Sequence, residues 1–248
     1  MSEARLREIS EPRFRDCGEA MLVVEFGSTL DPAPNARVLA LDAAMTAAAV
    51  PGVIELVPTF RSLAVHYDPL VIDRDDLVAR VRALEVGAER AECSVRRWVL
   101  PASFEGPHAE DLAEAAARLG MAPERLVGLL CGGWLRLAMY GFAPGFAYLG
   151  GVPADLALSR RVTPRPPHLE NAILIAGGMA AVARHPMPTG WWVVGAAAER
   201  TFDLGRDPNF VFAPGDEIRF EPVDAATFAA LGVRVAAGEI VARREAGR

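Results

Sequence analysis

Residues 141–151 read GFAPGFAYLGG, and no other stretch of the chain has so distinctive a composition. These eleven residues hold four glycines, one proline and three aromatic residues. Glycine allows backbone conformations that other residues avoid, and proline fixes the local turn. The stretch therefore predicts a shaped loop rather than a regular helix or strand.

A loop of this kind can present backbone N–H groups to a carbonyl oxygen or an anion. The side chains of Phe142, Phe146 and Tyr148 would then form the walls of a site. The alternative interpretation is a packed loop with a purely structural role. Composition alone leaves both interpretations open.

The chain before this loop alternates between strand-like and helix-like patterns. The alternation predicts strand, helix, strand, strand and helix, in that order, at residues 21–26, 32–49, 53–57, 62–67 and 73–84. Residues 95–100 form either the last strand of this unit or the first of the next. With that strand included, the order is typical of a ferredoxin-like α/β domain.

A second domain is expected to follow a charged, aperiodic stretch near residues 87–95. Two helices are predicted over residues 107–119 and 123–131. Short apolar runs separated by glycine and proline come next, which indicates a β-barrel or a sandwich. We therefore predict an α+β protein with an N-terminal domain over residues 1–92 and a β-rich domain over residues 93–248.

Composition excludes several classes of function. The net charge of −6 argues against broad nucleic-acid binding. All 26 basic residues are arginine, so a Schiff-base lysine and a Walker A loop are both excluded. Apolar runs fall short of the roughly 18 residues that span a bilayer, and the start of the chain is charged, so we expect a cytoplasmic protein. Four scattered histidines give no support for a metal site.

The glycine-rich stretch resembles the signature Gly-Phe-x-Pro-Gly-Phe-x-Tyr-Leu-Gly-Gly of the carboxyltransferase C/D-subdomain family. That family includes the B-type subunit of 5-oxoprolinase, allophanate hydrolase subunit 1, the sporulation-kinase inhibitor and part of urea carboxylase. Further motifs resemble those of the family in the same order, namely FRSLAVHYDP, RRVTPR, IAG, GW and PGDEIRF at residues 60–69, 160–165, 175–177, 190–191 and 214–220. The resemblance extends from about residue 14 to residue 222.

The resemblance implies a small ferredoxin-like domain followed by a cyclophilin-like β-barrel. It also implies a larger partner with the A/B half of the carboxyltransferase module, similar to the C-type subunit of 5-oxoprolinase or to allophanate hydrolase subunit 2, and a third subunit in bacterial 5-oxoprolinase. ATP would be the co-substrate of the complex, and the substrate a small amide such as 5-oxoproline. Allophanate or urea-related amide hydrolysis, and a regulatory module that inhibits a histidine kinase, remain alternatives.

The substrate site is expected around the glycine loop and the arginines that follow it, since arginine binds carboxylates and phosphates in a bidentate manner. The predicted substrate-binding residues are Phe142, Pro144, Gly145, Phe146, Tyr148, Gly150, Gly151, Arg161, Arg165 and Met179. No catalytic residue is predicted.

Several polar positions of the family are replaced here. Met179 and Ala180 stand where Gln and Thr are usual, Leu130 where a histidine is common, and Ala196 where an arginine is usual. If these residues line one pocket, that pocket is more apolar than in the family and favours a larger or less polar amide.

Overall fold

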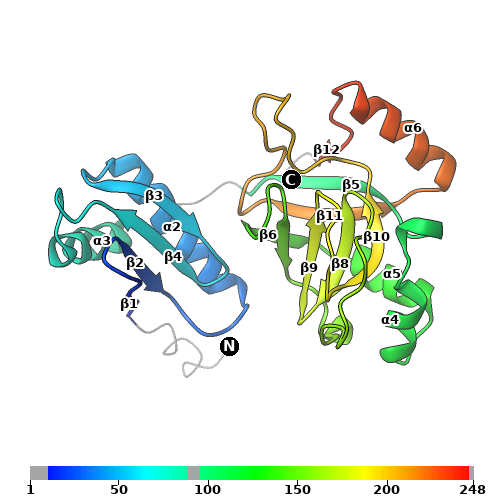
Figure 1. Cartoon of the computed structure of the whole chain (residues 1–248), viewed down its shortest axis with the longest axis horizontal. Coiled ribbons are helices and arrows are strands. Elements are labelled where there is room, and N and C mark those ends of the chain that lie inside the picture. Colours follow the sequence, from blue (N-terminus) through cyan, green and yellow to red (C-terminus); the bar gives the residue numbers. More distant parts are fainter. Residues whose placement is uncertain (1–10, 89–94, 246–248) are drawn as a thin grey trace. The chain divides into compact units, whose positions relative to one another are not determined.

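The computed structural model describes residues 11–88 and 95–245 of the chain. The chain divides into two compact units, Met1–Ser94 and Val95–Arg248, and the fold is α+β (Figure 1). The domain boundary that the sequence predicts between residues 92 and 93 lies outside the described residues.

Over its described residues, 11–88, the first unit is a four-stranded antiparallel sheet with two helices. Its elements are β1 (Arg13–Asp16), β2 (Met21–Glu25), α2 (Pro32–Ala48), β3 (Val53–Pro58), β4 (Ser62–Tyr67) and α3 (Arg74–Ala88). Buried and less buried residues alternate along β2 and β4, as expected for strands with one face against a core. Leu22 and Leu63 from the sheet share that core with Val38 and Leu41 of α2.

The ferredoxin-like order of elements is not confirmed. The sheet order is β1-β2-β4-β3, and the edge place beside β2 is taken by β1, which the sequence analysis did not predict. The strand is short, and three of its four residues, RFRD, are charged. Such a sequence suits an edge strand but gives no apolar alternation to detect. The strand that could have completed the ferredoxin-like order, β5 (Arg97–Ser103), belongs to the second unit.

The second unit is built on a closed barrel of seven strands. Its remaining strands are β6 (Leu135–Tyr140), β7 (Ala147–Gly150), β8 (Ala172–Ala176), β9 (Met179–Ala183), β10 (Trp192–Ala197), β11 (Glu217–Pro222) and the short β12 (Arg243–Arg244). The ring closes because β10 pairs with β8 on one side and with β5 on the other. Closure leaves β12 as an addition to β5 outside the ring.

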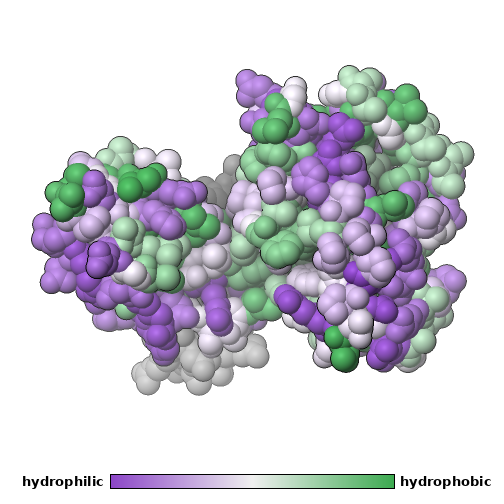
Figure 2. All heavy atoms as spheres, in the orientation of Figure 1, coloured by the Kyte–Doolittle hydropathy of each residue, from purple (hydrophilic) through white to green (hydrophobic). Residues whose placement is uncertain are grey.

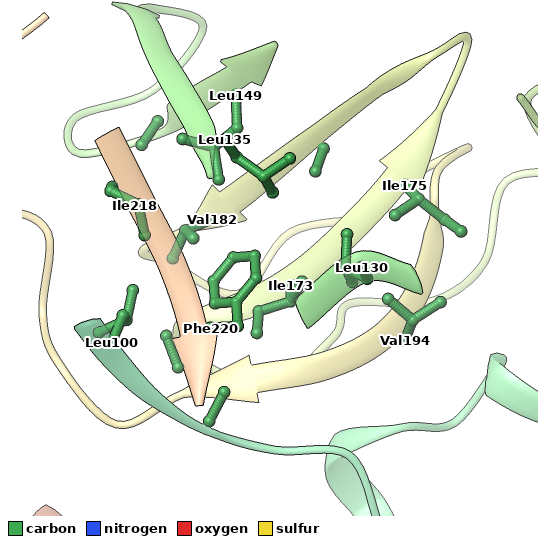
Figure 3. Close-up of a cluster of buried hydrophobic side chains, with 14 of the residues drawn as sticks. Leu100, Leu130, Leu135, Leu149, Ile173, Ile175, Val182, Val194, Ile218 and Phe220 are labelled. Carbon is green, nitrogen blue, oxygen red and sulfur yellow. The ribbon is translucent and has the colours of Figure 1, made fainter. Parts of the chain in front are cut away.

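The interior of the barrel is filled with apolar side chains. Figure 3 shows Leu100, Ile173, Val182 and Phe220 converging from different strands, and each of them is buried. Leu130 of helix α5 (Pro123–Cys131) is fully buried in the same cluster. The barrel is therefore a packed core and not an open channel.

The helix expected over residues 107–119 begins later, as α4 (Leu112–Arg118). A short 3-10 helix, Gly106–His108, precedes it. Asp111 then makes contacts that turn the chain toward the barrel, because its N–H donates to the carbonyl of Val193 at 2.9 Å and its carboxylate accepts from the Val193 N–H at 2.9 Å. The start of α4 is thus set by a strand that lies about 80 residues further along the chain.

The C-terminal part adds a helix that the sequence analysis did not predict, α6 (Ala225–Ala236). The Asp224 carboxylate caps it by accepting from the Thr227 N–H at 2.7 Å. Hydrophobic side chains gather over this helix in Figure 2, and Val233 is 73% exposed. The chain then returns to the barrel, where the fully buried Glu199 carboxylate accepts from the Val241 N–H at 2.6 Å.

Candidate functional site

The glycine-rich stretch forms the hairpin loop between β6 and β7. The Gly141 N–H donates to the Phe146 carbonyl at 3.2 Å and closes the loop. Gly145 has φ of +72°, and a Cβ at this position would lie 2.6 Å from the Phe202 Cβ. The Thr201 hydroxyl donates to the Gly145 carbonyl at 2.6 Å. Gly145 is therefore required by both backbone conformation and close packing.

Four aromatic side chains, Phe142, Phe146, Tyr148 and Trp191, form a layer on the outer side of the barrel wall, and we call them the aromatic layer. Ring centroids lie 5.7 Å apart for Phe142–Phe146, 4.7 Å for Phe146–Tyr148 and 6.0 Å for Tyr148–Trp191. Phe146 and Trp191 are buried, whereas Phe142 is 80% exposed. The layer thus has a buried base and an exposed edge.

The backbone of Phe142 is in the left-handed region, with φ of +67°. A bulky residue adopts this conformation only when its surroundings impose it, and such outliers gather at functional sites. The strained residue at this position carries an apolar ring that is exposed to solvent.

The other loop residues of the predicted site are divided between two ends of β7. Pro144 is exposed at the tip of the loop beside Phe142. Gly150 is the last residue of β7, where it pairs with Arg136 of β6, and Gly151 follows with φ of +83°. These two glycines lie at the opposite end of the strand from the aromatic layer's exposed edge.

The guanidinium groups of Arg161 and Arg165 are paired with carboxylates of the same chain. Asp111 accepts from Arg161 at 3.2 Å and from Arg165 at 3.0 Å. Arg161 also pairs with Glu114, and Arg165 with Glu110. The guanidinium of Arg161 further lies 4.6 Å from the centre of the buried Trp192 ring. Both arginines thus tie the 160–165 segment to residues 110–114, around the start of α4.

Arg160 has different surroundings, and the sequence analysis did not include it in the predicted site. Its guanidinium lies over the ring of Trp191, 5.6 Å from the centroid, and the residue is exposed. Over residues 11–88 and 95–245, no carboxylate lies within 4.0 Å of it. The sequence held one usable signal, the neighbouring pairs Arg160-Arg161 and Trp191-Trp192, which the structure matches one to one.

Burial raises the pKa of the Tyr148 phenol, and the positive charge of Arg160 acts in the opposite direction. Arg160 is thus close enough to the aromatic layer to influence its one titratable member electrostatically.

The replaced polar positions do not meet in one pocket. Met179 packs against the cluster that contains Phe146, whereas the next residue, Ala180, is fully buried in the barrel interior. Leu130 lies in that interior as well. Neighbouring residues of a strand point to opposite faces of the sheet, so Met179 and Ala180 are separated by the barrel wall. The more apolar pocket expected from these positions is therefore not formed.

His168, which the sequence places in a loop, is 2% exposed. Its Nδ1 lies 2.7 Å from the Leu169 carbonyl, and Nε2 has no partner among the residues that the structure describes. Burial, the largest cause, lowers the pKa of this imidazole. Among all the residues that the structure describes, no three histidine, cysteine or acidic side chains are grouped as a metal ion would require. No helix in those residues is long and apolar enough to cross a bilayer.

The family model of the carboxyltransferase domain, subdomains C and D, matches residues 12–212, which include both the glycine loop and the segment with Arg160. The chain belongs to this family. Among curated proteins it is similar to the B-type subunit of 5-oxoprolinase from Bacillus subtilis, with 28% identity over 222 residues that cover 84% of this chain and 91% of that protein. It is also similar to the B-type subunit of the Escherichia coli O157:H7 enzyme, with 29% identity over 208 residues, 83% of this chain and 93% of that protein.

Solved structures with a similar fold are known. The crystal structure of TTHA0988 matches with a TM-score of 0.73 and 31% identity. The matched region covers 83% of this chain but only 40% of the TTHA0988 chain. The urea carboxylase of Kluyveromyces lactis has a TM-score of 0.74 over 94% of this chain and 24% of its own, at 16% identity. This second likeness shows the fold alone.

Proposed function

We propose that this chain is a non-autonomous subunit of an ATP-dependent amide or lactam hydrolase, with the opening of 5-oxoproline to glutamate as the first choice of reaction. One observation carries the proposal. The most distinctive sequence of the family forms an aromatic layer on the outside of the barrel, while the interior is filled with apolar side chains. A substrate held there would be open to water unless a second protein covered it.

The partner in this proposal is the A/B half of the carboxyltransferase-like module, with a third subunit in the 5-oxoprolinase arrangement. ATP is the co-substrate of the complex. Phosphorylation of the amide oxygen makes the amide carbon electrophilic, and attack by water then opens the lactam and releases phosphate. The names of the relatives, which are subunits, support a complex of this kind.

The decisive experiment co-expresses the chain with the proposed A/B-type partner and measures ATP hydrolysis with a panel of cyclic and open-chain amides. We expect ATP hydrolysis that depends on 5-oxoproline and yields one glutamate per ADP. The isolated chain serves as the control and is expected to hydrolyse neither compound. Turnover by the isolated chain, or no turnover of any amide by the complex, would contradict the proposal.

Two alternatives remain within reach of the same experiment. Turnover of allophanate or a urea derivative in place of 5-oxoproline would identify the related amide hydrolase. A regulatory module, such as one that inhibits a histidine kinase, is favoured by one observation, the apolar residues Leu130, Met179 and Ala180 at positions that are usually polar. That alternative predicts a stable complex without ATP turnover.

A further inference from the structure

The three arginines of the 160–165 segment are in different electrostatic states. Arg161 and Arg165 share the carboxylates of Glu110, Asp111 and Glu114, so their charge is compensated within the chain. A guanidinium paired in this way has little capacity left for an external anion. Arg160 is exposed and has no such partner within the described ranges, so its charge is available.

The setting of Arg160 favours recognition of a carboxylate. An arginine that stacks on an aromatic ring keeps the N–H groups at its edge free, and those groups match the two oxygens of a carboxylate. The Trp191 ring below it is 5% exposed and packs against Phe146 and Tyr148 of the same layer, so the support is rigid. Rigid support lowers the entropy that is lost when an anion binds.

An apolar contact surface adjoins this charge through the aromatic layer. Contacts run from Arg160 to Trp191, then to Phe146 at 6.3 Å between centroids, and then to Phe142. Phe142 is the most exposed member of the layer, and its backbone has a positive φ. The surface therefore combines one uncompensated positive charge with one exposed ring.

We infer that Arg160 and Phe142 form a binding site, on the outside of the barrel, for a small amide that carries a carboxylate. Arg160 binds the carboxylate, and Phe142 contacts the apolar part of the ligand. The proposed function supplies the amide in this inference, whereas the carboxylate and the apolar part follow from the site itself. The arginine that recognises the anion is thus Arg160, in place of Arg161 and Arg165.

The chain offers a matched control for Arg160. Arg244 is also exposed and also lies 5.6 Å from the centroid of a tryptophan ring, that of Trp98. The Trp98 indole N–H donates to the Asp216 carboxylate at 3.0 Å, and Arg96 already pairs with that carboxylate at 2.7 Å. Trp98 belongs to the main core cluster and not to the aromatic layer, so Arg244→Gln removes the same type of stacked charge from a place outside the proposed site.

The test uses NMR titration of the full chain with 5-oxoproline and with its neutral carboxamide at millimolar concentrations. We expect wild type to prefer the acid, and Arg160→Gln to weaken binding of the acid by about 10- to 100-fold, as for a lost charge-assisted hydrogen bond. Binding of the carboxamide should change little in that variant. Arg244→Gln should keep the wild-type preference, and Phe142→Ala should weaken both ligands to a similar degree.

Several outcomes would overturn the inference. These are no binding of the acid to wild type, equal binding of acid and carboxamide, or a preference that persists in Arg160→Gln. If Arg160→Gln instead prevents association with the A/B-type partner while the preference for the acid remains, Arg160 binds a protein carboxylate and the small-ligand site is wrong.

The inference and the proposed function fail in different ways. In the assembled complex, turnover of 5-oxoproline with an unchanged KM in Arg160→Gln would overturn the site and leave the function intact. A charge-dependent preference in the isolated chain, together with a complex that hydrolyses no amide, would leave the site intact and overturn the function.

Discussion

Trp191 and Trp192 are neighbours in sequence, yet they lie on opposite sides of the barrel wall and have different surroundings. Trp191 lies in the aromatic layer under Arg160, and Trp192 lies in the barrel's main core cluster under Arg161. Both rings are buried and each has an arginine stacked over it. Among the residues that the structure describes, carboxylates neutralise Arg161, through Asp111 and Glu114, but not Arg160.

The difference shows that the same pair of residue types can serve stability on one side and recognition on the other. On the Trp192 side, charges are matched and buried, so removing a partner is costly. On the Trp191 side, the charge is exposed and unmatched, so removing it should cost the fold little. Unfolding of the barrel unit can be followed by tryptophan fluorescence, because all four tryptophans lie after residue 94.

The largest effect is expected for Asp111→Ala. The change removes the most buried of the carboxylates that compensate Arg161 and Arg165, which keep only Glu114 and Glu110, and it removes the side-chain acceptor of the Val193 N–H. We expect a loss of about 3–5 kcal/mol in the free energy of unfolding, measured by urea titration. Arg160→Gln is the control and should change that free energy by less than about 0.5 kcal/mol. Similar losses in the two variants would remove the contrast between the two sides.

Gly145→Ala should destabilise the loop that carries the aromatic layer. The new Cβ meets the Phe202 Cβ at 2.6 Å, and the backbone keeps a φ of +72°. Gly178→Ala is a matched control, since its φ is +76° and no atom lies within 4 Å of the new Cβ. We expect Gly145→Ala to cost about 1–3 kcal/mol more than the control, as for an overpacked site. Equal losses would show that the loop is not held by packing.

Met179→Gln and Ala180→Thr restore two residues that are common in the family, on opposite faces of β9. Ala180 is fully buried in the barrel interior, so the extra atoms of Thr should cost about 1–3 kcal/mol in thermal or urea unfolding. Met179 is only partly buried, and Gln should cost less than about 1 kcal/mol. The reverse order of effects would mean that Met179, and not Ala180, faces the barrel interior.

The smallest effect concerns pH and His168. Its pKa is lowered by burial, so the unfolded chain binds the proton more tightly than the folded chain does. Stability should therefore fall as pH drops below the ordinary histidine pKa of 6.5 and level off below the folded pKa. Urea titrations at several pH values should show this slope in wild type and a smaller slope in His168→Gln. A slope of the same size in the variant would assign the pH dependence to other groups.

Local patterns were sufficient for much of the architecture. The alternation in residues 62–67 predicted β4, and one of the short apolar runs predicted for the second domain is β8, because each pattern depends only on which neighbours face a core. The start of α4 at Leu112 could not be predicted in this way, because Val193 decides it from a distant strand. β1 was missed because its short sequence has no apolar repeat. α6 did carry a signal, the capping Asp224 followed by Phe228, Leu231 and Val235 at helical spacing, which the prediction did not use.

The candidate site also has features that the sequence determined and features that depend on the tertiary structure. The sequence by itself determined the family, the glycine loop and the residue types around it, since these are fixed by composition and order. It could not show which of Arg160, Arg161 and Arg165 keeps an uncompensated charge, because the compensating carboxylates lie about 50 residues away in the chain. It also could not show that Met179 and Ala180 are separated by the barrel wall. Only the tertiary structure decides which charges meet and which face of a strand is buried, because both depend on contacts between segments that are distant in sequence.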